Sequence, residues 1–584
     1  MTFKKLLALM LIVAMIMVTT ACGAKTETSE TSGTLESEGG TFIGEADGKN
    51  GPIKVEVTIE KGEITGIEII ENHESDFTKT TFDEILATII AQNTADVDVI
   101  TGATMTSEAI ISAVSDALSK SGITLVAKQA NAENTVFTDT EADIVIIGAG
   151  GAGLTAAIEA TKKGAKVIVV EKNSFMGGNT NYATGGMNAA NTKLQAEKGV
   201  VDSAELFYED TLKGGHNLND PVLLKKLTEE SSNAIDWLTE IGASLTKLSR
   251  SGGQSVDRTH TTADGSPIGS YLMSVFEKNI VDLGIEVRLN TKATEIIAKD
   301  NQAAGIVVET NDGQTYSIHA KAVIIASGGF GANQELVVQY KPELEGFGTT
   351  NHPGATGDAF YMLDALKVAT VDMEQIQTHP TVVPVKNEMI TEGVRGEGAL
   401  LVNREAVRFI NELETRDVVS KAILAQEGKT AFLILDSGVE ERLASVSKYK
   451  KMGLLTEGAT IAELAEKLGL DPVVLEETVT SYNTYFKNQN DEEFGRRVLA
   501  GEIAKGPFYA VEVAPAIHHT MGGIKINDQA QVLNTSSEVV PGLFAAGEVT
   551  GGIHGGNRIG GNAVADIVVF GRIAGSSAAD YIQK

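Results

Sequence analysis

A short glycine-rich segment matches the pattern G-x-G-x-x-G through Gly148, Gly150 and Gly153. It joins a predicted strand (141–148) to a predicted amphipathic helix (152–164), and a second strand follows at 165–172. In this arrangement glycines let the backbone approach a pyrophosphate, and the start of the helix offers N–H donors. Glu171, 23 residues after Gly148, is placed to bind a ribose hydroxyl. The pattern therefore predicts a dinucleotide site in a βαβ unit, without choosing between FAD and NAD.

The chain around this unit has the composition of a large globular protein. Its 584 residues are 42% hydrophobic and 22% charged, which excludes a disordered chain and allows several domains. The formal net charge of −30 makes nucleic acid an unsuitable partner. The single Cys excludes an intrachain disulfide, a four-Cys iron–sulfur cluster and a CxxCH haem attachment. We assign no metal ligands and expect organic redox chemistry.

The N-terminus has the features of an export signal. Lys4 and Lys5 precede 13 apolar residues (6–18), too few to span a bilayer, and small residues follow up to Cys22. This arrangement resembles bacterial lipoproteins, although Thr19 stands where that family usually has Leu. We predict a signal peptide (1–21), a lipidated Cys22 on a flexible tether (22–39), and anchoring to the outer face of the cell membrane. The alternative is an ordinary signal anchor with a buried Cys.

A small α+β module is predicted over 40–126, followed by a linker (127–140). Its pattern indicates two strands within 53–70 and helices near 80–93 and 108–121. Between the helices, DVITGAT (98–104) resembles the flavinylation motif of FMN-binding domains. The resemblance implies FMN esterified to Thr104 by a flavin transferase, with Thr106 the less suitable residue. The alternative is an unmodified polar loop.

Six later segments occur in a distinctive order. They are FMGGNTNYATGGMNAA (175–190), GATGDAF (354–360), THPT (378–381), MITEGVRGEGALLVNREAVRFINELETRD (389–417), AIHHTMGG (516–523) and AAGEVTGGIHGGNRIGGNAVAD (545–566). Together they resemble the soluble, flavocytochrome-type fumarate reductases, a family that includes urocanate reductases and related enoate reductases. The resemblance implies non-covalent FAD and an α/β fold. A Rossmann-type FAD-binding domain (141–373 and 519–584) would follow the FMN-binding domain and contain an inserted α+β capping domain, the cap (374–518).

Reduction of a C=C bond between carboxylates needs cations that bind the substrate, a hydride donor on one face and a proton donor on the other. In so acidic a chain these cations must be placed deliberately, because a dianion would otherwise be repelled. Holding both carboxylates would twist the substrate and make an alkene carbon more electrophilic. The substrate-binding residues that the resemblance implies are His379, Met389, Thr391, His518, Arg558, Gly186 and Gly561.

The resemblance assigns proton donation to Arg416 and the relay to solvent to Glu392 and Arg395. Arginine is a poor acid because its free pKa exceeds 12. The role therefore needs burial beside other cations and a relay. The simpler alternative is a local ion pair between Arg416 and Asp417.

The implied FAD contacts extend beyond the glycine-rich turn. His518 and His519 are adjacent, so an extended segment directs them to opposite sides, and the resemblance implies substrate for His518 and flavin for His519. A final helix (562–583) would direct its positive end towards the flavin. The predicted FAD-binding residues are Gly148, Gly150, Ala152, Gly153, Glu171, Lys172, Gly178, Asn179, Thr180, Gly185, Gly186, Asp358, His519, Glu548, Arg558, Ala563 and Val564.

These features predict an exported flavoenzyme that reduces an α,β-unsaturated carboxylate. FMN on Thr104 would pass electrons from a membrane or extracellular donor to FAD. Fumarate is favoured because His379, Met389 and Thr391 match the fumarate pattern; urocanate, acrylate and cinnamate are alternatives. A non-catalytic electron-transfer lipoprotein would not need the proton relay. An NAD-dependent dehydrogenase would need a second G-x-G-x-x-G, which the sequence lacks.

Overall fold

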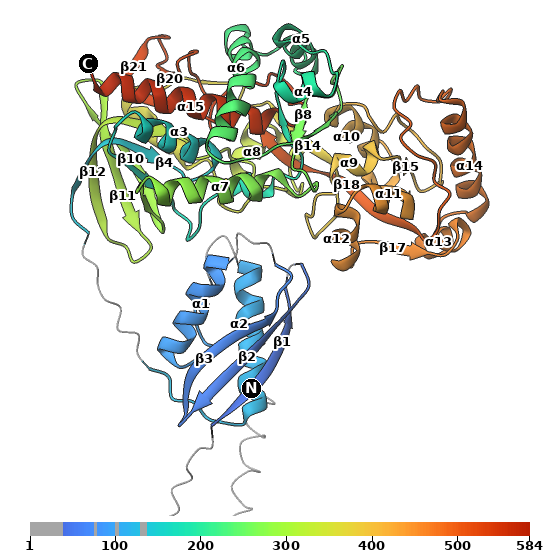
Figure 1. The fold of residues 1–584 in the computed structure, drawn as a ribbon, viewed down its shortest axis with the longest axis horizontal. Helices are drawn as coiled ribbons and strands as arrows, with labels where there is room; N and C mark the ends of the chain where they lie inside the picture. The colour runs from blue at the N-terminus through green and yellow to red at the C-terminus, as the bar shows by residue number, and fades with distance from the viewer. Residues whose placement is uncertain (1–38, 49, 75–78, 100–103, 129–136) are drawn as a thin grey trace, which may run out of the picture.

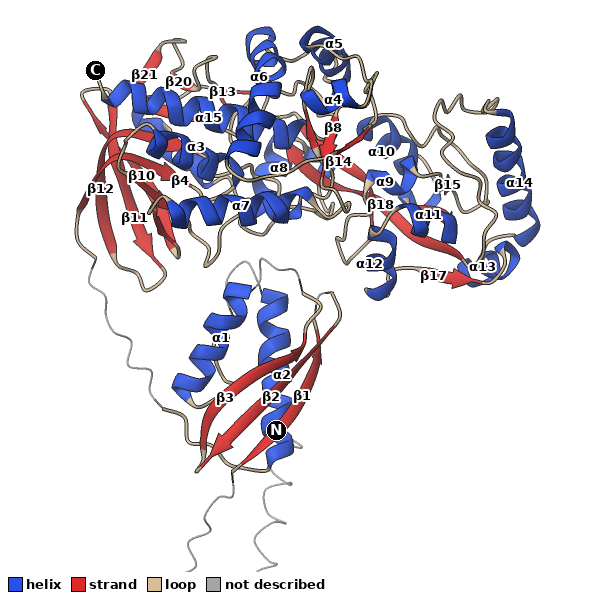
Figure 2. Cartoon of the chain, viewed as in Figure 1, coloured by secondary structure: helices blue, strands red, loops and turns tan. Residues whose placement is uncertain are grey.

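The computed structural model describes residues 39–584 except 49, 75–78, 100–103 and 129–136. The predicted signal peptide and Cys22 lie outside the described residues. The structure has three parts: a body built on a large sheet, a cap on a smaller sheet beside it, and an N-terminal module that lies below the two in this view (Figures 1 and 2).

The N-terminal module is an antiparallel sheet in the order β1-β2-β3 with two helices on one face (blue in Figure 1). Every second residue of β2 is buried against the helices, from Ile53 to Ile59. β2, β3 and both helices agree with the predicted segments, whereas β1 was not predicted and α2 begins four residues earlier than expected. The elements are β1 (Gly40–Asp47), β2 (Pro52–Glu60), β3 (Glu63–Glu71), α1 (Lys79–Gln92) and α2 (Thr104–Ser121).

The body is organised around a sheet with the strand order β10-β11-β12-β4-β5-β9, in which β21 also pairs with β12. β12, β4, β5, β9 and β21 are parallel, while β10, β11 and β12 form an antiparallel meander. The strands are β4 (Thr140–Ile147), β5 (Val167–Val170), β9 (Glu286–Arg288), β10 (Thr291–Lys299), β11 (Gln302–Thr310), β12 (Thr315–Ile325), β20 (Gln531–Leu533) and β21 (Val539–Ala545).

Helices and a small sheet surround this parallel core. The predicted βαβ unit is present as β4, α3 and β5, and α15 packs directly on α3. A Cβ on Gly575 would lie 2.3 Å from the Ala156 carbonyl oxygen, so only glycine permits this close packing. The elements are α3 (Gly151–Lys162), α4 (Lys193–Glu197), α5 (Ala204–Gly214), α6 (Pro221–Glu240), α7 (Ile268–Asp282), α8 (Gln334–Tyr340), α15 (Asn562–Ile582), and strands β6 (Met187–Asn188), β7 (Lys247–Ser249) and β8 (Thr259–Thr261).

The cap is inserted between β12 and β21 of the body. Its sheet has the order β14-β18-β16-β15, with β17 also paired to β18, and β13 pairs with β19 at the junction with the body. The strands are β13 (Thr370–Val371), β14 (Ile376–Val382), β15 (Leu400–Val402), β16 (Ala431–Asp436), β17 (Thr456–Gly458), β18 (Phe508–Thr520) and β19 (Gly523–Ile524). The helices are α9 (Glu392–Gly396), α10 (Arg416–Leu424), α11 (Ser437–Arg442), α12 (Ser445–Lys451), α13 (Ile461–Leu468) and α14 (Pro472–Asn488).

Within the described part of the chain, none of the helices combines the length and apolar character needed to cross a membrane.

Candidate active site

The glycine-rich turn forms the floor of a narrow cavity of about 110 Å³ between β4, β5 and α3. Gly148 adopts a φ of +103°, and a Cβ there would lie 2.5 Å from the Ala326 carbonyl oxygen. A Cβ on Gly153 would lie 2.0 Å from the Gly148 carbonyl oxygen, so Gly153 acts through packing and lines neither cavity. Gly150 lines the cavity. The backbone is therefore open to a pyrophosphate where the sequence predicts it, which fits FAD.

Two charged groups after β5 define the other end of this cavity. The buried Glu171 carboxylate accepts hydrogen bonds from the backbone of Ala149 (3.0 Å) and Asn173 (2.9 Å), and burial raises the pKa of this carboxyl. Lys172 contacts Asp358 at 2.5 Å. Burial alone would raise the pKa of Asp358, but Lys172 lowers it. This polar end suits the ribose side of a dinucleotide.

A second cavity, of about 2120 Å³, adjoins the first and lies between the body and the cap. Both cavities are lined by Asn179, Thr180 and Glu548, so the FAD groove leads into the larger space. The smaller cavity also has Ala152 and Gly178 in its lining. Predicted residues lining the larger cavity are Gly185, Gly186, His379, Met389, Thr391, Glu392, Arg395, Arg416, His518, His519, Arg558, Gly561, Ala563 and Val564.

Arg416 forms a two-pronged ion pair with Glu392 in this cavity. Its Nε lies 2.9 Å from Glu392 Oε1, and its Nη2 lies 3.0 Å from Glu392 Oε2. Arg395 follows one helical turn later, with Nη2 3.5 Å from Glu392 Oε1. The alternative pairing of Arg416 with Asp417 is wrong, because Asp417 contacts His216 instead. The structure thus brings the three predicted proton-transfer residues into one chain of contacts.

The charges in this chain shift one another's pKa. Burial alone would raise the pKa of Glu392, but Arg416 and Arg395 lower it to about 2. Burial, together with Arg416 and Arg496, lowers the pKa of Arg395 to about 10. Burial and Arg416 also lower the pKa of Arg558 to about 9. Glu392 is therefore an anion at neutral pH, while the two arginines are more acidic than free arginine.

Imidazole groups complete the wall of the cavity. The His379 and His518 rings meet edge to face, with centroids 5.1 Å apart. Burial, followed by the charge of Arg416, holds the pKa of both imidazoles well below the ordinary value, so both are neutral at pH 7. Within the described structure, His379 Nε2 and Arg558 Nε are buried without a hydrogen-bond partner. Such unpaired polar atoms fit an oxygen-rich, anionic ligand.

His518 and His519 on β18 have different neighbours, as alternation predicts. His518 Nδ1 lies 2.7 Å from the Thr350 hydroxyl, beside His379. His519 instead meets His554 edge to face, with centroids 5.3 Å apart. The first residues of α15 line the same cavity, so the positive end of this helix faces it.

Gln377 is a site residue that sequence reasoning missed. Its side-chain oxygen accepts a hydrogen bond from Arg416 Nη1 (3.1 Å), and its nitrogen donates to the Arg558 carbonyl oxygen (2.8 Å) and to Asn557 (2.6 Å). It therefore links the predicted proton donor to a predicted substrate-binding segment. The only signal in the sequence is its position directly before THPT.

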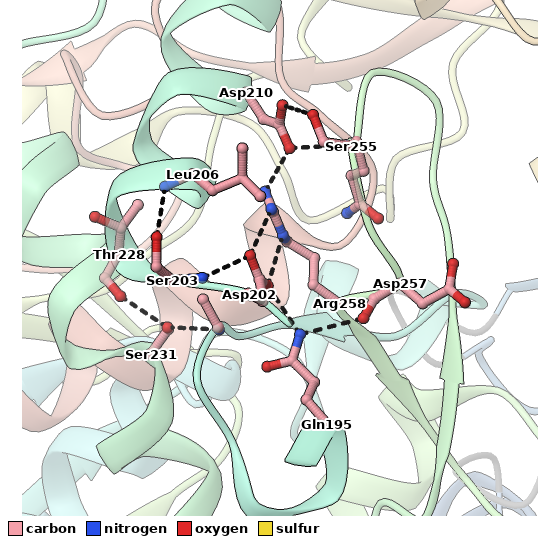
Figure 3. A network of polar contacts seen from close by, with 12 residues as sticks. Gln195, Asp202, Ser203, Leu206, Asp210, Thr228, Ser231, Ser255, Asp257 and Arg258 are labelled. Atoms are coloured by element: carbon pink, nitrogen blue, oxygen red, sulfur yellow. Dashed lines mark hydrogen bonds and ion pairs between the residues drawn. The ribbon is translucent and has the colours of Figure 1, made fainter. Parts of the chain in front are cut away.

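A loop at 251–255 also lines the cavity, and a buried ion network anchors it (Figure 3). The Arg258 side chain is fully buried and lies 2.9 Å from Asp202 and 2.8 Å from Asp210. Asp210 in turn accepts hydrogen bonds from the backbone and hydroxyl of Ser255. Arg258 thus ties the loop to α5 and β8.

The N-terminal module faces the same cavity. Asn50, His73, Glu74 and Thr106 contribute to its lining, and the Thr106 hydroxyl donates to Glu74 Oε2 (2.7 Å). The predicted flavin attachment point, Thr104, begins α2 two residues earlier. Its side chain and residues 100–103 of the motif lie outside what the structure describes.

A Rossmann-type groove that continues into a capped, cation-lined cavity defines the class: a flavoprotein oxidoreductase. Residues 143–564 match the FAD binding domain family, and residues 48–119 match the FMN-binding domain family. The chain is 44% identical over 543 residues to NADH:fumarate oxidoreductase of Klebsiella pneumoniae (strain 342), covering 92% of this chain and 58% of that protein. It is 37% identical over 582 residues to urocanate reductase of Eggerthella lenta, covering 96% and 95%.

Among solved structures, the open conformation of a flavocytochrome c3 fumarate reductase superposes with a TM-score of 0.66 at 42% identity, covering 76% of this chain and 79% of that one. The chain belongs to the family of FAD-dependent oxidoreductases, acting on CH–CH groups, that includes fumarate and urocanate reductases. The predicted α/β class with an N-terminal FMN-binding domain is confirmed.

Proposed function

We propose that this protein reduces an α,β-unsaturated carboxylate, with fumarate, which becomes succinate, as the first candidate. The observation that carries the proposal is the continuous chain Arg416–Glu392–Arg395, which borders a cavity lined by unpaired cationic and imidazole donors. A dicarboxylate supplies the charges that such a cavity lacks. The chain's relatives include a fumarate and a urocanate reductase, which supports the enoate class.

FAD, when bound, supplies the hydride that adds to one alkene carbon. The chain supplies the rest of the reaction: Arg558, His379 and His518 hold the carboxylates, and Arg416 gives one proton to the neighbouring carbon. Glu392 is an anion at rest, so it first takes a proton from Arg395 and passes that proton on to Arg416. Arg395 then regains a proton from solvent. One hydride and one proton convert the C=C bond into CH–CH, so the charges balance.

FMN esterified to Thr104 would be the point where electrons enter, after attachment by a flavin transferase. The proposal is supported by the match to FMN-binding domains and by the position of α2, whose Thr106 lines the substrate cavity. Electrons would come from a membrane or extracellular donor.

The test is a panel of enoates assayed with reduced viologen as artificial donor. Fumarate, urocanate, acrylate and cinnamate are offered separately to the FAD-loaded protein. Fumarate is expected to give the highest kcat/KM. A higher kcat/KM for urocanate would make urocanate the substrate and leave the proposed mechanism unchanged. Reduction of none of the four would contradict the proposal and favour a non-catalytic electron carrier.

Export and lipid anchoring at Cys22 are part of the same proposal. They are supported by the sequence of the signal segment alone. Cys22→Ser should release the protein from membranes or block its processing, which fractionation of cells and the mass of the mature chain would reveal. Unchanged membrane retention with normal signal cleavage would show that another feature holds the protein.

A further inference from the structure

Two of the three proton-transfer residues lie on α9, a helix of only five residues. Thr391 precedes this helix, and Glu392 and Arg395 belong to it. So short a helix has little stability of its own, because nucleation costs more than one turn returns. We propose that Tyr449 and Arg496 of the cap are positioning residues that hold α9 at its two ends and thereby set the spacing of the proton relay. This inference rests on the proposed function and names two further residues that it needs.

Tyr449 holds the first end. The Thr391 backbone N–H donates to the Tyr449 hydroxyl oxygen at 3.0 Å. The Tyr449 ring is 3% exposed and packs in the cap core with Ile390 and Val394, on either side of the segment that it holds. Burial raises the pKa of this phenol, so the hydroxyl stays neutral. Tyr449 thus fixes the point where α9 begins.

Arg496 holds the second end. The last carbonyl groups of a helix have no partners within the helix. At the Arg395 carbonyl oxygen, which the Gly398 backbone N–H also reaches at 3.2 Å, the Arg496 guanidinium donates a hydrogen bond. It donates a second one, at 3.1 Å, to the carbonyl oxygen of Ala399, three residues beyond the helix. The contact with Arg395 spans 101 positions of sequence. The end of α9 is therefore fastened to the segment that follows α14.

A balanced set of buried charges keeps Arg496 in place. Arg496 Nη1 also lies 3.1 Å from Glu412, whose carboxylate is held by Arg408 at 2.9 Å. Arg408 in turn contacts Asp491 at 2.9 Å. The Glu412 carbonyl oxygen accepts a hydrogen bond from Arg395 Nη1 at 2.6 Å, so the same set also contacts the relay. Two cations and two anions cancel, as burial requires.

The spacing of the relay depends on these backbone contacts because the side-chain contact is weak. Arg395 reaches Glu392 only at 3.5 Å, and among the described residues its Nε and Nη2 have no hydrogen-bond partner. A small shift of the helix would break the relay. Neither Tyr449 nor Arg496 lines the substrate cavity, so neither is placed to touch substrate or FAD.

The test compares Tyr449→Phe and Arg496→Lys with Tyr509→Phe. Tyr509 is a matched control: it belongs to the same cap core, and its hydroxyl hydrogen-bonds Lys450 and Glu440 rather than α9. We expect kcat to fall by about tenfold or more in the first two variants, because an unsatisfied buried partner remains. KM should change by less than about threefold, since Arg558, His379 and His518, which hold the carboxylates, make no hydrogen bond or ion pair with Tyr449 or Arg496 in the described structure. The solvent deuterium isotope effect on kcat should rise as proton delivery becomes limiting.

Hydrogen exchange of the peptide 389–399 gives a readout that does not depend on turnover. It should accelerate in Tyr449→Phe and Arg496→Lys and stay as in wild type in Tyr509→Phe, with equal FAD content in all three. Wild-type kcat and wild-type exchange in both variants would overturn the inference. If the wild type reduces no enoate, the proposed function fails, and the exchange measurement alone decides whether Tyr449 and Arg496 hold α9.

Discussion

His216 Nε2 and Asp417 Oδ2 lie 3.0 Å apart, and this contact joins the body to the cap directly beside Arg416. Both side chains are partly exposed. Arg416 and Asp417 are neighbours on the first turn of α10, yet they serve different partners. Asp417 connects the two parts of the molecule at the surface, which leaves the Arg416 guanidinium for Glu392 in the cavity.

Replacement of Arg416 should mainly affect turnover. Arg416→Ala is expected to lower kcat by about 10²–10⁴, the range for loss of a general acid, with FAD content unchanged. Asp417→Asn is the control, because loss of an exposed pair costs at most about 1 kcal/mol. Steady-state assays with reduced viologen measure both variants. Near-normal turnover in Arg416→Ala would overturn the mechanism, whichever enoate is the substrate.

Substrate capture should weaken at alkaline pH. The pKa of Arg558 is lowered to about 9 by burial and by Arg416, and only the charged guanidinium binds a carboxylate. kcat/KM should therefore fall as the pH rises through about 9, because this profile reports groups of the free enzyme. His379 and His518 stay neutral over the neutral range and should add no step there. A step near neutral pH that disappears in His379→Gln would contradict this assignment.

Peptide-bound flavin should depend on one threonine. After denaturation, the peptide 100–107 is expected to carry FMN, and Thr104→Ala should lose it. FAD should be released, since the glycine-rich groove offers no covalent link. Thr106→Val should keep the flavin, because the Thr106 hydroxyl is already engaged by Glu74. The measurement is mass spectrometry of the peptide 100–107 from protein made in a host that has the flavin transferase. An unmodified peptide from such a host would rule out FMN as the group through which electrons enter.

The ion network in Figure 3 should contribute strongly to stability. Arg258→Met would leave Asp202 and Asp210 without their buried partner, which costs about 3–5 kcal/mol. Arg250→Met, directly before the same loop, is the matched control, since the Arg250–Asp257 pair is exposed and worth at most about 1 kcal/mol. Calorimetric unfolding of the FAD-loaded protein compares the two. An equal loss of stability in the two variants would show that burial of the Arg258 ion pairs adds nothing to the stability of the protein.

The parts of the fold with strong periodicity could be predicted from the sequence. The βαβ unit and α15 have clear patterns, and the structure agrees with both. β1 was missed because two of its inward-facing residues, Gly44 and Ala46, are small while the apolar Ile43 faces outward, so the sequence shows no clear apolar alternation. The sequence also has strand-like runs at 320–329 and 539–552, and both strands end earlier in the structure: β12 runs from Thr315 to Ile325 and β21 from Val539 to Ala545. Glycine-rich loops follow both strands and continue their apolar composition.

The residues of the candidate site also differ in whether the sequence could predict them. Residues inside recognisable motifs, such as Arg416 and Glu392, could be predicted, and the structure places them around one cavity. Gln377, Tyr449 and Arg496 act only through contacts made by folding, and Arg496 lies 101 positions from the residue that it holds. For Tyr449 and Arg496 the sequence pattern gives no indication of these pairings, and for Gln377 it gives only the position directly before THPT.

The position of β21 also constrains how the protein is made. This strand pairs with β12 in the parallel part of the large sheet, but the whole cap lies between the two strands in the sequence. A ribosome must therefore complete the cap before the sheet that binds FAD can close. Glu548, Ala563 and α15 are synthesised later still. A chain that ends anywhere within the cap therefore lacks β21, α15 and the lining residues Glu548 and Ala563, so its FAD site is incomplete.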